Sequence, residues 1–482
     1  IRFYTSSFSI EEGYEMKKIY AETMIFFAVL AAFGIANMLN PVKPTISEVE
    51  NRALAGKPVF SAASFFRGKY FEDYNNYYND TFVLRDEMIL LSRDIRDAFT
   101  VDSGYVLVVA EQDKLPQGQQ DSGDDTGLTD GKDKNNFENS EETASAGDIN
   151  EAQTPHEGSE TIGEDKMEET SKPGLELEDD GNMGYWLLVD GKAVELFRFN
   201  QEAIDYYVET INMYHEKLGD TVKLYSMIAP TAGEFTLMKR YQNMTDSQNE
   251  AMIYINSKLH PDIKTVDVFN ALSKHKNEYI YFRTDHHWTA LGAYYAYEAF
   301  MNARGEEAVP LERYETVTVD NFLGSAYTKT LSKDLENNPD TIQIYLPFTK
   351  NRFTRYSGNT PKEADVIDLS YAEGKDKYLV FISSGGGTWS VIQTDVKNGK
   401  KLLIMKDSFG NAIAPFFMPH YEEIYIIDSR FYSTAHTKMN IPQFIEHHGI
   451  QEVAFIHYME DVNWAEFMQT VRNLLFEDEN TR

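Results

Sequence analysis

The sequence predicts an α/β fold in three layers, α/β/α, with a parallel sheet of about five strands. Apolar runs of strand length lie at residues 222–229, 265–269, 401–405, 424–428 and 453–457. Segments with apolar residues at helical spacing lie between several of them, at 201–217, 248–259 and 289–303. Strands that alternate with helices form parallel sheets covered on both faces. Residues 304–400 are less regular, with β-like pieces such as 341–346 and 378–382, and we expect them beside the functional edge.

The N-terminal segment predicts a membrane anchor. Met16-Lys17-Lys18 precedes the apolar residues 19–39, so residues 1–18 are expected in the cytoplasm and the rest of the chain outside it. Met16 is a natural start, which makes residues 1–15 a candidate gene-start artefact. The alternative is a cleaved signal peptide, with Gly34 and Ala36 as small residues near the cut. We favour an uncleaved signal anchor, so the expected location is the cell membrane, with a single span.

About half of the net charge of −32 comes from one segment. Residues 111–181 hold 22 acidic and five basic residues among polar ones, a composition typical of disorder. The flanking residues 105–109 and 185–196 are β-like, the latter with a turn at Asp190-Gly191. We therefore predict a disordered acidic insert extruded from a hairpin, and one folded domain built from 40–110 and 182–482. The remaining core is also acidic and lacks a basic patch with aromatics, which argues against nucleic-acid binding.

Several side chains that could take part in catalysis lie close together in the run Arg283-Thr284-Asp285-His286-His287-Trp288-Thr289. Residues 279–283 alternate like a short strand, and Thr289 is a candidate N-cap for the helix that follows. Asp285, two residues before His287, can hold that imidazole in one tautomer and stabilise its charged form. A lone histidine would more simply be a surface group, with Trp288 as a core anchor. The clustering of Asp285, two histidines and Trp288 nevertheless favours a functional site.

Ser408 is the best candidate nucleophile. The apolar run 401–405 predicts a buried strand that breaks at Asp407-Ser408, before a short helix at 409–417 that is limited by Pro415. At such a junction, backbone N–H groups at the helix N-terminus can stabilise an oxyanion. Taken alone, Ser408 fits an N-cap better than a nucleophile. Together with Asp285 and His287 it completes an acyl-transfer set.

The pairing of Asp-His-His-Trp at 285–288 with Lys-Asp-Ser-Phe-Gly-Asn at 406–411 resembles the DHHW protein family, whose relatives are the alginate O-acetyltransferases. The resemblance runs from about Glu50 onward, apart from the insert, and includes segments 50–52, 71–85 and 428–432. It implies an SGNH hydrolase-like fold with a permuted triad, in which Ser408 is the nucleophile, His287 the base and Asp285 its orienting carboxylate. Lys406 stands where SGNH hydrolases usually have glycine, so the oxyanion hole departs from the usual pattern.

Four further residues are candidates for the oxyanion hole or for substrate binding. Gly386 lies in the glycine-rich loop 383–388, which can approach a ligand closely or simply be flexible. Asn411 follows Ser408 by one helical turn and could equally face solvent. Arg430 could meet substrate, or pair with Asp428 instead, and Trp288 completes the set. The chain has no cysteine, so thiolate metal sites and cysteine nucleophiles are excluded. We expect no metal and no cofactor.

These features predict an extracytoplasmic O-acyltransferase, most simply an O-acetyltransferase, that modifies a cell-wall or secreted polysaccharide through an acyl-enzyme. The resemblance also implies a membrane-bound O-acyltransferase partner that supplies the acyl group. A carbohydrate esterase, or deacetylase, with the same triad is the close alternative. Two other classes stay open: metal-dependent phosphoester hydrolysis through Asp285, His286 and His287, and a non-catalytic polysaccharide-binding or assembly protein.

Overall fold

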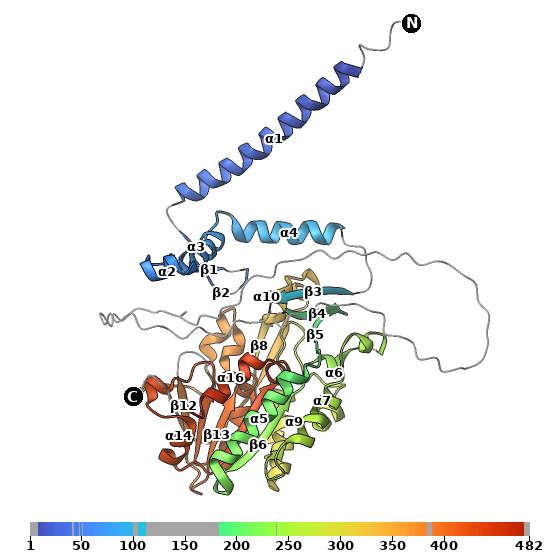
Figure 1. Cartoon of the computed structure of the whole chain (residues 1–482). Coiled ribbons are helices and arrows are strands. Elements are labelled where there is room, and N and C mark those ends of the chain that lie inside the picture. The colour runs from blue at the N-terminus through green and yellow to red at the C-terminus, as the bar shows by residue number, and fades with distance from the viewer. Residues whose placement is uncertain are drawn as a thin grey trace, which may run out of the picture. The chain divides into compact units, whose positions relative to one another are not determined.

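The computed structural model of the protein describes residues 8–40, 43–47, 49–50, 52–99, 105–111, 183–237, 239–382 and 388–476. The chain divides into two compact units, residues 1–100 and 101–482 (Figure 1). The domain predicted at 40–110 and 182–482 therefore draws on both units. The predicted disordered insert lies outside the described residues, apart from its first residue.

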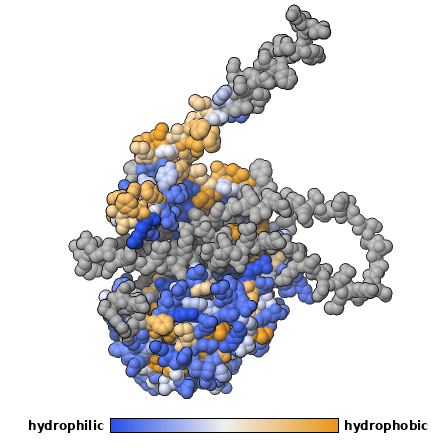
Figure 2. All heavy atoms as spheres, in the orientation of Figure 1, coloured by the Kyte–Doolittle hydropathy of each residue, from blue (hydrophilic) through white to orange (hydrophobic). Residues whose placement is uncertain are grey.

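The first unit begins with helix α1 (Phe8–Leu39). The segment Tyr20–Leu39 of this helix is long and apolar enough to cross a membrane, although a signal sequence near the N-terminus passes the same test. Figure 2 shows this part of the helix largely in the colours of hydrophobic residues. The predicted apolar N-terminal helix is thus present. A short strand pair and three helices follow: β1 (Ile46–Ser47), β2 (Arg52–Ala53), α2 (Ala62–Phe66), α3 (Lys69–Asp80) and α4 (Arg85–Phe99).

A buried ionic cluster holds the first unit together. The Arg52 guanidinium donates to both carboxylate oxygens of Asp80, at 2.9 and 2.6 Å, and to Glu50 at 3.0 Å. Arg85 donates to Glu50 at 2.9 Å. Burial opposes ionisation, yet the hydrogen bonds from Arg52 hold the pKa of Asp80 below its usual value. These residues come from two of the segments that carried the family resemblance, 50–52 and 71–85, and they link β2 to the ends of α3 and α4.

The second unit is built on an eight-stranded sheet. Its order is β11 (Thr360–Ala364), β10 (Asn351–Ser357), β12 (Trp389–Thr394), β14 (Glu423–Asp428), β13 (Lys401–Lys406), β15 (Glu452–Tyr458), β6 (Lys223–Ala229) and β7 (Lys264–Thr265). The strands from β14 to β7 run parallel, whereas β12, β10 and β11 extend the sheet antiparallel. The predicted α/β fold with a parallel sheet is therefore confirmed for the central strands, and the whole sheet is mixed.

Two apolar cores lie on opposite faces of this sheet. Along β13, Leu402 and Ile404 join one core, whereas Leu403 and Met405 join the other, as the alternation of a strand requires. Both faces are apolar because helices cover both (Figure 1). The first core includes residues of α8 (Val268–Lys274), α9 (Ala290–Arg304) and α12 (Gly410–Ile413). The second includes residues of α5 (Gln201–Leu218), α7 (Gln248–Lys258), α14 (Ile441–His448) and α16 (Ala465–Asn473).

Two predicted strands differ from the structure. The run 265–269 forms only the two-residue strand β7, because Asp267 caps α8 by accepting a hydrogen bond from the Asn270 amide. The run 378–382 begins in a 3-10 helix, Lys377–Val380, and has a single bridge from Phe381 to Ile367. Short apolar runs do not distinguish strands from short helices. The strands predicted at 222–229, 401–405, 424–428 and 453–457 are present as β6, β13, β14 and β15. The strand predicted at 341–346 is present as β9 (Asp340–Leu346), which pairs with β8 (Glu315–Phe322).

The predicted hairpin at 185–196 is also present, as β4 (Met183–Val189) and β5 (Lys192–Leu196). Asp190 and Gly191 both have positive φ, at 51° and 68°, as a two-residue hairpin turn of type I′ requires. Strand β3 (Val106–Glu111) pairs antiparallel with β4, and Glu111 lies opposite Met183. The last described residue before the gap at residues 112–182 and the first one after it therefore lie opposite each other in one sheet.

Candidate active site

The loop that carries Asp285 and His287 is a tight hairpin in front of α9. Residues Tyr281 and Trp288 form a single antiparallel bridge, and the Thr289 amide donates to the Ile280 carbonyl at 2.9 Å. The Thr289 hydroxyl then caps α9 by accepting from the Gly292 amide. The predicted N-cap is confirmed, whereas the predicted strand at 279–283 is reduced to this one bridge.

A buried carboxylate from β9 anchors the same loop. Asp340 is fully buried and accepts hydrogen bonds from the amides of Arg283 and Thr284, at 3.0 and 2.8 Å, and from the Thr284 hydroxyl at 2.7 Å. The Arg283 guanidinium donates to it at 3.0 Å, and the Tyr279 hydroxyl donates as well. Sequence reasoning missed Asp340 because it lies 55 residues beyond Asp285, in the segment without clear periodicity.

Asp285 and His287 form a buried pair within the loop. Asp285 Oδ1 accepts from the His287 amide at 2.9 Å and lies 2.6 Å from His287 Nδ1, while its Oδ2 accepts from the Ser325 amide at 2.8 Å. Burial opposes ionisation, but the interactions with His287 hold the pKa of Asp285 well below its usual range. An ionised Asp285 keeps the proton on Nδ1 and leaves Nε2 as an acceptor.

Gly324 gives Asp285 the space it occupies. A Cβ atom at position 324 would lie 2.3 Å from both Cβ and Oδ2 of Asp285, far inside van der Waals contact. Its neighbour Ser325 opens helix α10 (Ser325–Thr330) and supplies the amide that binds Asp285. A glycine at 324 thus allows the helix to approach the carboxylate closely.

Ser408 meets this pair from the central strand of the sheet. It follows β13, and the Asp407 carboxylate fixes the turn by accepting from the amides of Phe409, at 2.8 Å, and Tyr458 on β15. Ser408 Oγ lies 2.7 Å from His287 Nε2. This distance falls in the range of about 2.6–3.2 Å expected between a nucleophile and its base. Asp285, His287 and Ser408 therefore form one continuous chain of hydrogen bonds.

Aromatic rings hold the imidazole and the serine turn in place. The Tyr378 ring stacks on His287, with centroids 3.9 Å apart and planes 13° from parallel. The Tyr378 hydroxyl reaches the Ser408 carbonyl at 3.4 Å. Trp288 is fully buried, and its indole N–H donates to the Phe409 carbonyl at 3.1 Å. The candidate role of Trp288 in substrate binding is therefore corrected, because its ring packs beneath the turn and presents no surface to a substrate.

The other predicted site residues differ in how they are placed. Arg430 makes a two-fold ion pair with Asp428, at 2.9 and 2.7 Å, so its guanidinium is already engaged. Burial opposes ionisation, yet Arg430 lowers the pKa of Asp428 to about 2. Asn411 does not face solvent: it is 1% exposed, and its Oδ1 has no hydrogen-bond partner among the described residues. Gly386 lies outside the described residues.

Lys406 stands at the position where the sequence resemblance leads us to expect glycine, and Gly410 leaves room for its side chain. It is buried, and its Nζ lies 3.6 Å from Asp428. A Cβ atom at Gly410 would lie 2.5 Å from the Lys406 side chain. The aliphatic stem of Lys406 therefore occupies the space that a side chain at position 410 would need.

Asp376 is a further acidic group near the site that sequence reasoning missed. Burial and the negative charge of Asp285 raise the pKa of Asp376 to about 6. It begins the 3-10 helix that carries Tyr378, in a segment we expected to be β-like. No sequence signal marked it, since its proximity to Asp285 depends on the tertiary fold.

Metal binding by the same loop competes with the hydrogen bonds just described. Asp285, His286 and His287 each offer a ligand atom, and these atoms lie within 4.8 Å of one another. The two ring nitrogens of His287, however, face Asp285 and Ser408, and His286 Nδ1 faces the Ser325 hydroxyl. A metal ion would have to replace these partners, so the geometry favours the serine-based arrangement.

The fold and this arrangement define an α/β protein with a Ser-His-Asp hydrogen-bond chain at the carboxyl end of a central parallel strand. Residues 50–427 match the DHHW protein family, and the chain belongs to that family. The resemblance found in the sequence motifs is thus confirmed. No curated protein matches the sequence.

One solved structure of the same family agrees with the assignment, and two more distant structures are also similar. A crystal structure of a DHHW family protein from Eubacterium siraeum is 32% identical, with a TM-score of 0.53, and the match covers 61% of this chain and 96% of that one. The structure of Bacillus cereus PatB1 is 21% identical, with a TM-score of 0.50 and coverage of 58% and 97%, and it supports the fold alone. The O-acetyltransferase domain of Pseudomonas putida AlgJ is more distant, at 13% identity and a TM-score of 0.31, with coverage of 59% and 96%.

Proposed function

We propose that this protein is an SGNH-like O-acyltransferase that moves acetyl groups onto a cell-wall or secreted polysaccharide. The observation that carries the proposal is the hydrogen-bond chain from Asp285 through His287 to Ser408, with links of 2.6 and 2.7 Å. A serine placed against a neutral imidazole whose far side is held by a carboxylate is the arrangement that acyl transfer needs. Ser408 is only partly buried, so a donor ester can reach it.

In the first step of this mechanism, Ser408 Oγ attacks the carbonyl carbon of the donor ester while His287 Nε2 takes the hydroxyl proton. Asp285 stabilises the imidazolium that forms. The tetrahedral intermediate then collapses, its bond to the leaving alcohol breaks, and His287 returns the proton to that alcohol. Ser408 is left as an acetyl ester. We assign the developing oxyanion to the Ser408 amide and to the side-chain amide of the buried Asn411.

In the second step, a sugar hydroxyl gives its proton to His287 and attacks the acetyl carbon. The bond to Ser408 Oγ breaks, and Ser408 takes back the proton. If water enters instead of the sugar, the same residues release acetate, so a carbohydrate esterase is the second candidate. The partial exposure of Ser408 favours this alternative, because water as well as sugar can approach the acyl-enzyme.

An acceptor-dependence assay separates the two candidates. The purified protein is given a chromogenic acetyl ester, with and without cell-wall oligosaccharides, and both acetate and acetylated sugar are measured. A transferase produces acetylated sugar, with chromophore release that rises with acceptor concentration. An esterase produces acetate at a rate that does not depend on the oligosaccharide.

A variant at Ser408 tests whether the site is catalytic at all. Ser408→Ala is expected to abolish acetyl transfer, whereas Ser257→Ala, an exposed serine on α7, serves as the matched control. If Ser408→Ala left the acetylation of the producing cell's polysaccharide intact, the catalytic proposal would fail and a non-catalytic binding or assembly role would gain support.

We also propose that α1 anchors the enzyme in the cell membrane, with the second unit outside the cytoplasm, and that a membrane-bound O-acyltransferase supplies the acetyl group. The apolar segment Tyr20–Leu39 supports the anchor. Removal of residues 8–39 should move the protein from the membrane to the soluble fraction while hydrolysis of a chromogenic ester persists. Acetylation of the polysaccharide in cells should fall, because the truncated protein lacks the proposed signal anchor and is no longer held near the membrane-bound donor partner. A truncated protein that remains with the membrane would contradict the anchor.

A further inference from the structure

A second cluster of side chains, which could bind a metal ion, lies at the edge of the sheet opposite Ser408. His215 lies near the end of α5, which leads into β6, and His260 and Asp262 lie in the turn that leads into β7. These strands run parallel to β13 and β15, and Ser408 follows the carboxyl end of β13. The cluster therefore lies near the amino ends of parallel strands, away from the proposed active site.

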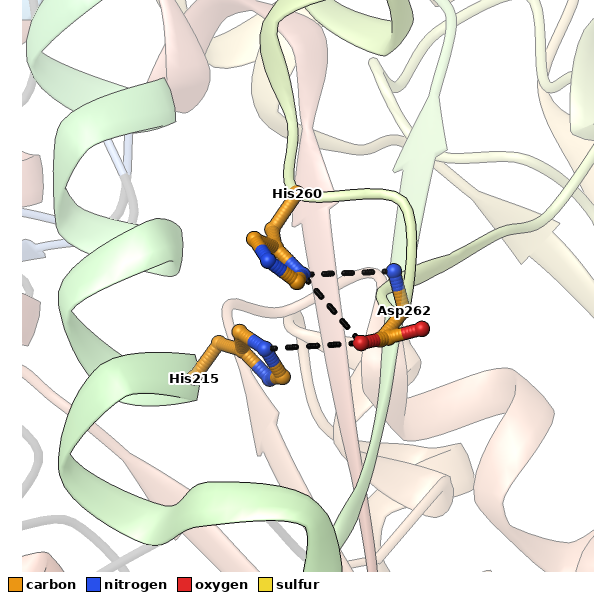
Figure 3. Close-up of side chains that lie close together, drawn as sticks. All are labelled: His215, His260 and Asp262. Atoms are coloured by element: carbon orange, nitrogen blue, oxygen red, sulfur yellow. Dashed lines mark hydrogen bonds and ion pairs between the residues drawn. The ribbon is translucent and has the colours of Figure 1, made fainter.

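The three side chains converge on one point, as Figure 3 shows. Asp262 Oδ2 lies 3.6 Å from His260 Nδ1 and 4.0 Å from His215 Nε2. The imidazole centroids are 4.1 Å apart, and one ligand atom from each residue lies within 4.8 Å of the others. Tetrahedral zinc, with bonds of about 2.0–2.2 Å, holds its ligand atoms roughly 3.3–3.6 Å apart. The distances from Asp262 Oδ2 to the two histidine nitrogens, 3.6 and 4.0 Å, are close to that spacing.

The backbone beneath the cluster is already fixed. Asn212, one helical turn before His215, accepts from the His260 amide at 2.8 Å and donates to the Lys258 carbonyl at 3.1 Å. This side chain clamps α5 to the turn that bears His260 and Asp262. The ligands are also reachable from solvent, because the side chains of His260 and Asp262 are 45% and 69% exposed. The cluster is therefore preorganised and open to an ion.

We propose that His215, His260 and Asp262 bind a divalent transition-metal ion, with zinc as the best fit and water as the fourth ligand. Two imidazoles and one carboxylate suit zinc, whereas calcium and magnesium prefer sites built from oxygen ligands. The ion replaces the hydrogen bond of 3.3 Å from the Asp262 amide to His260 Nδ1. The ion would join α5 to the turn that precedes β7, away from Ser408, so the chemistry proposed for Ser408 does not depend on it.

Zinc titration of the full-length protein in detergent tests this site. Isothermal titration calorimetry with zinc chloride should show saturable binding of one ion per chain, and the melting temperature should rise with zinc. Asp262→Asn and His215→Ala should each weaken binding by about 100-fold or more. Asp262→Asn is the safer variant for folding, because that side chain is largely exposed. His447→Ala, an exposed histidine on α14, is the matched control and should bind like wild type.

His287→Ala distinguishes this site from the loop of the proposed active site. If zinc binding were lost in His287→Ala but kept in Asp262→Asn and His215→Ala, the ion would belong to Asp285, His286 and His287, and the proposal would be overturned. The absence of saturable binding by the wild-type protein would overturn it as well. Zinc bound at the proposed site should leave ester hydrolysis unchanged, so the test does not depend on the proposed enzymatic function.

Discussion

The roles of Asp285 and His287 follow from what each side chain contacts. Asp285 is buried, and among the described residues its oxygens interact with two backbone amides and an imidazole and with no lysine or arginine side chain. Such a carboxylate both orients the ring and favours its charged form. His287 is held on one face by Tyr378, so its Nε2 has little freedom to turn away from Ser408. The side chains that we propose for catalysis are therefore held in place before substrate binds.

Asp285→Asn should lower the rate of acetyl transfer by roughly 10³–10⁴-fold, because an amide can stabilise the wrong tautomer of His287 and cannot stabilise its charged form. The side chain keeps its size, so the melting temperature should change little. The measurement is the kcat for a chromogenic acetyl ester, with Asp205→Asn on α5 as a surface control. A kcat within about threefold of wild type would show that Asp285 does not act through His287.

Asp376 should make stability depend on pH. Its pKa of about 6 in the folded protein lies above its ordinary value of 3.8, so the folded state binds the proton more tightly than the unfolded state does. Its contribution is therefore fully present below about pH 4 and is lost as the pH rises to about 6. After allowance for partial exposure, the loss is on the order of 1–2 kcal/mol.

The test of that pH dependence compares wild type with Asp376→Asn in chemical unfolding experiments between pH 4 and pH 8. The variant carries no titrating group at this position, so the wild-type free energy of unfolding should fall relative to it across the interval. A constant difference between the two proteins would contradict the raised pKa.

The loop in front of α9 is a structural element defined by contacts from elsewhere in the chain. Asp340 on β9 binds its backbone, and Gly324 admits the N-terminus of α10 to Asp285. Residues 304–346, which belong to the less regular segment of the sequence, therefore hold this loop in position. This arrangement explains why an Asp-x-His spacing in a short loop can be held rigidly.

Gly324→Ala should reduce the activity of the protein more than it reduces the stability of the fold. The added Cβ would lie 2.3 Å from the Asp285 side chain, which must then move away from His287 or push α10 aside. Overpacking of this kind costs about 1–3 kcal/mol. We expect a large loss of kcat with a modest drop in melting temperature. Gly56→Ala, where a Cβ would meet nothing within 4 Å, is the control.

The site residues that could be predicted from the sequence are those that lie in a recognisable local motif. Asp285, His287 and Ser408 lie in short motifs at the ends of apolar runs, and the structure brings them together. Asp340, Tyr378 and Asp376 lie in irregular segments, and their contacts depend on the tertiary fold. The strand at 265–269 was wrong because a capping aspartate outweighs a short apolar run. The antiparallel strands β10 to β12 lie within the irregular segment, where the sequence shows neither clear periodicity nor pairing partners.

The chain as a whole joins a potential membrane helix to an α/β unit, and its whole family match, residues 50–427, lies beyond that helix. The ionic cluster of the first unit is the part most sensitive to charge removal. Burying a charge is costly unless a partner compensates it. Arg52, Glu50, Asp80 and Arg85 compensate one another within that unit.

Asp80→Asn should destabilise the first unit by about 3 kcal/mol at pH 7, because the buried Arg52 would lose one of its two ionic partners and keep only Glu50. The lowered pKa of Asp80 in the folded state means that this stabilisation is present above its ordinary pKa of 3.8 and is lost as the pH falls below it. Limited proteolysis of the full-length protein in detergent should show faster cleavage within residues 52–99 of the variant. Equal cleavage rates at pH 7 would contradict a stabilising role.

The central claim is that Ser408 carries the acyl group, and trapping the acyl-enzyme tests it most directly. The protein is incubated with an activated acetyl ester, quenched in acid, digested, and its peptides are measured by mass spectrometry. We expect one acetyl group on the peptide that contains Ser408, and none on that peptide in Ser408→Ala or in unreacted protein. Turnover of the ester with no acetyl group on Ser408, or with the acetyl group on another residue that turns over, would contradict the mechanism.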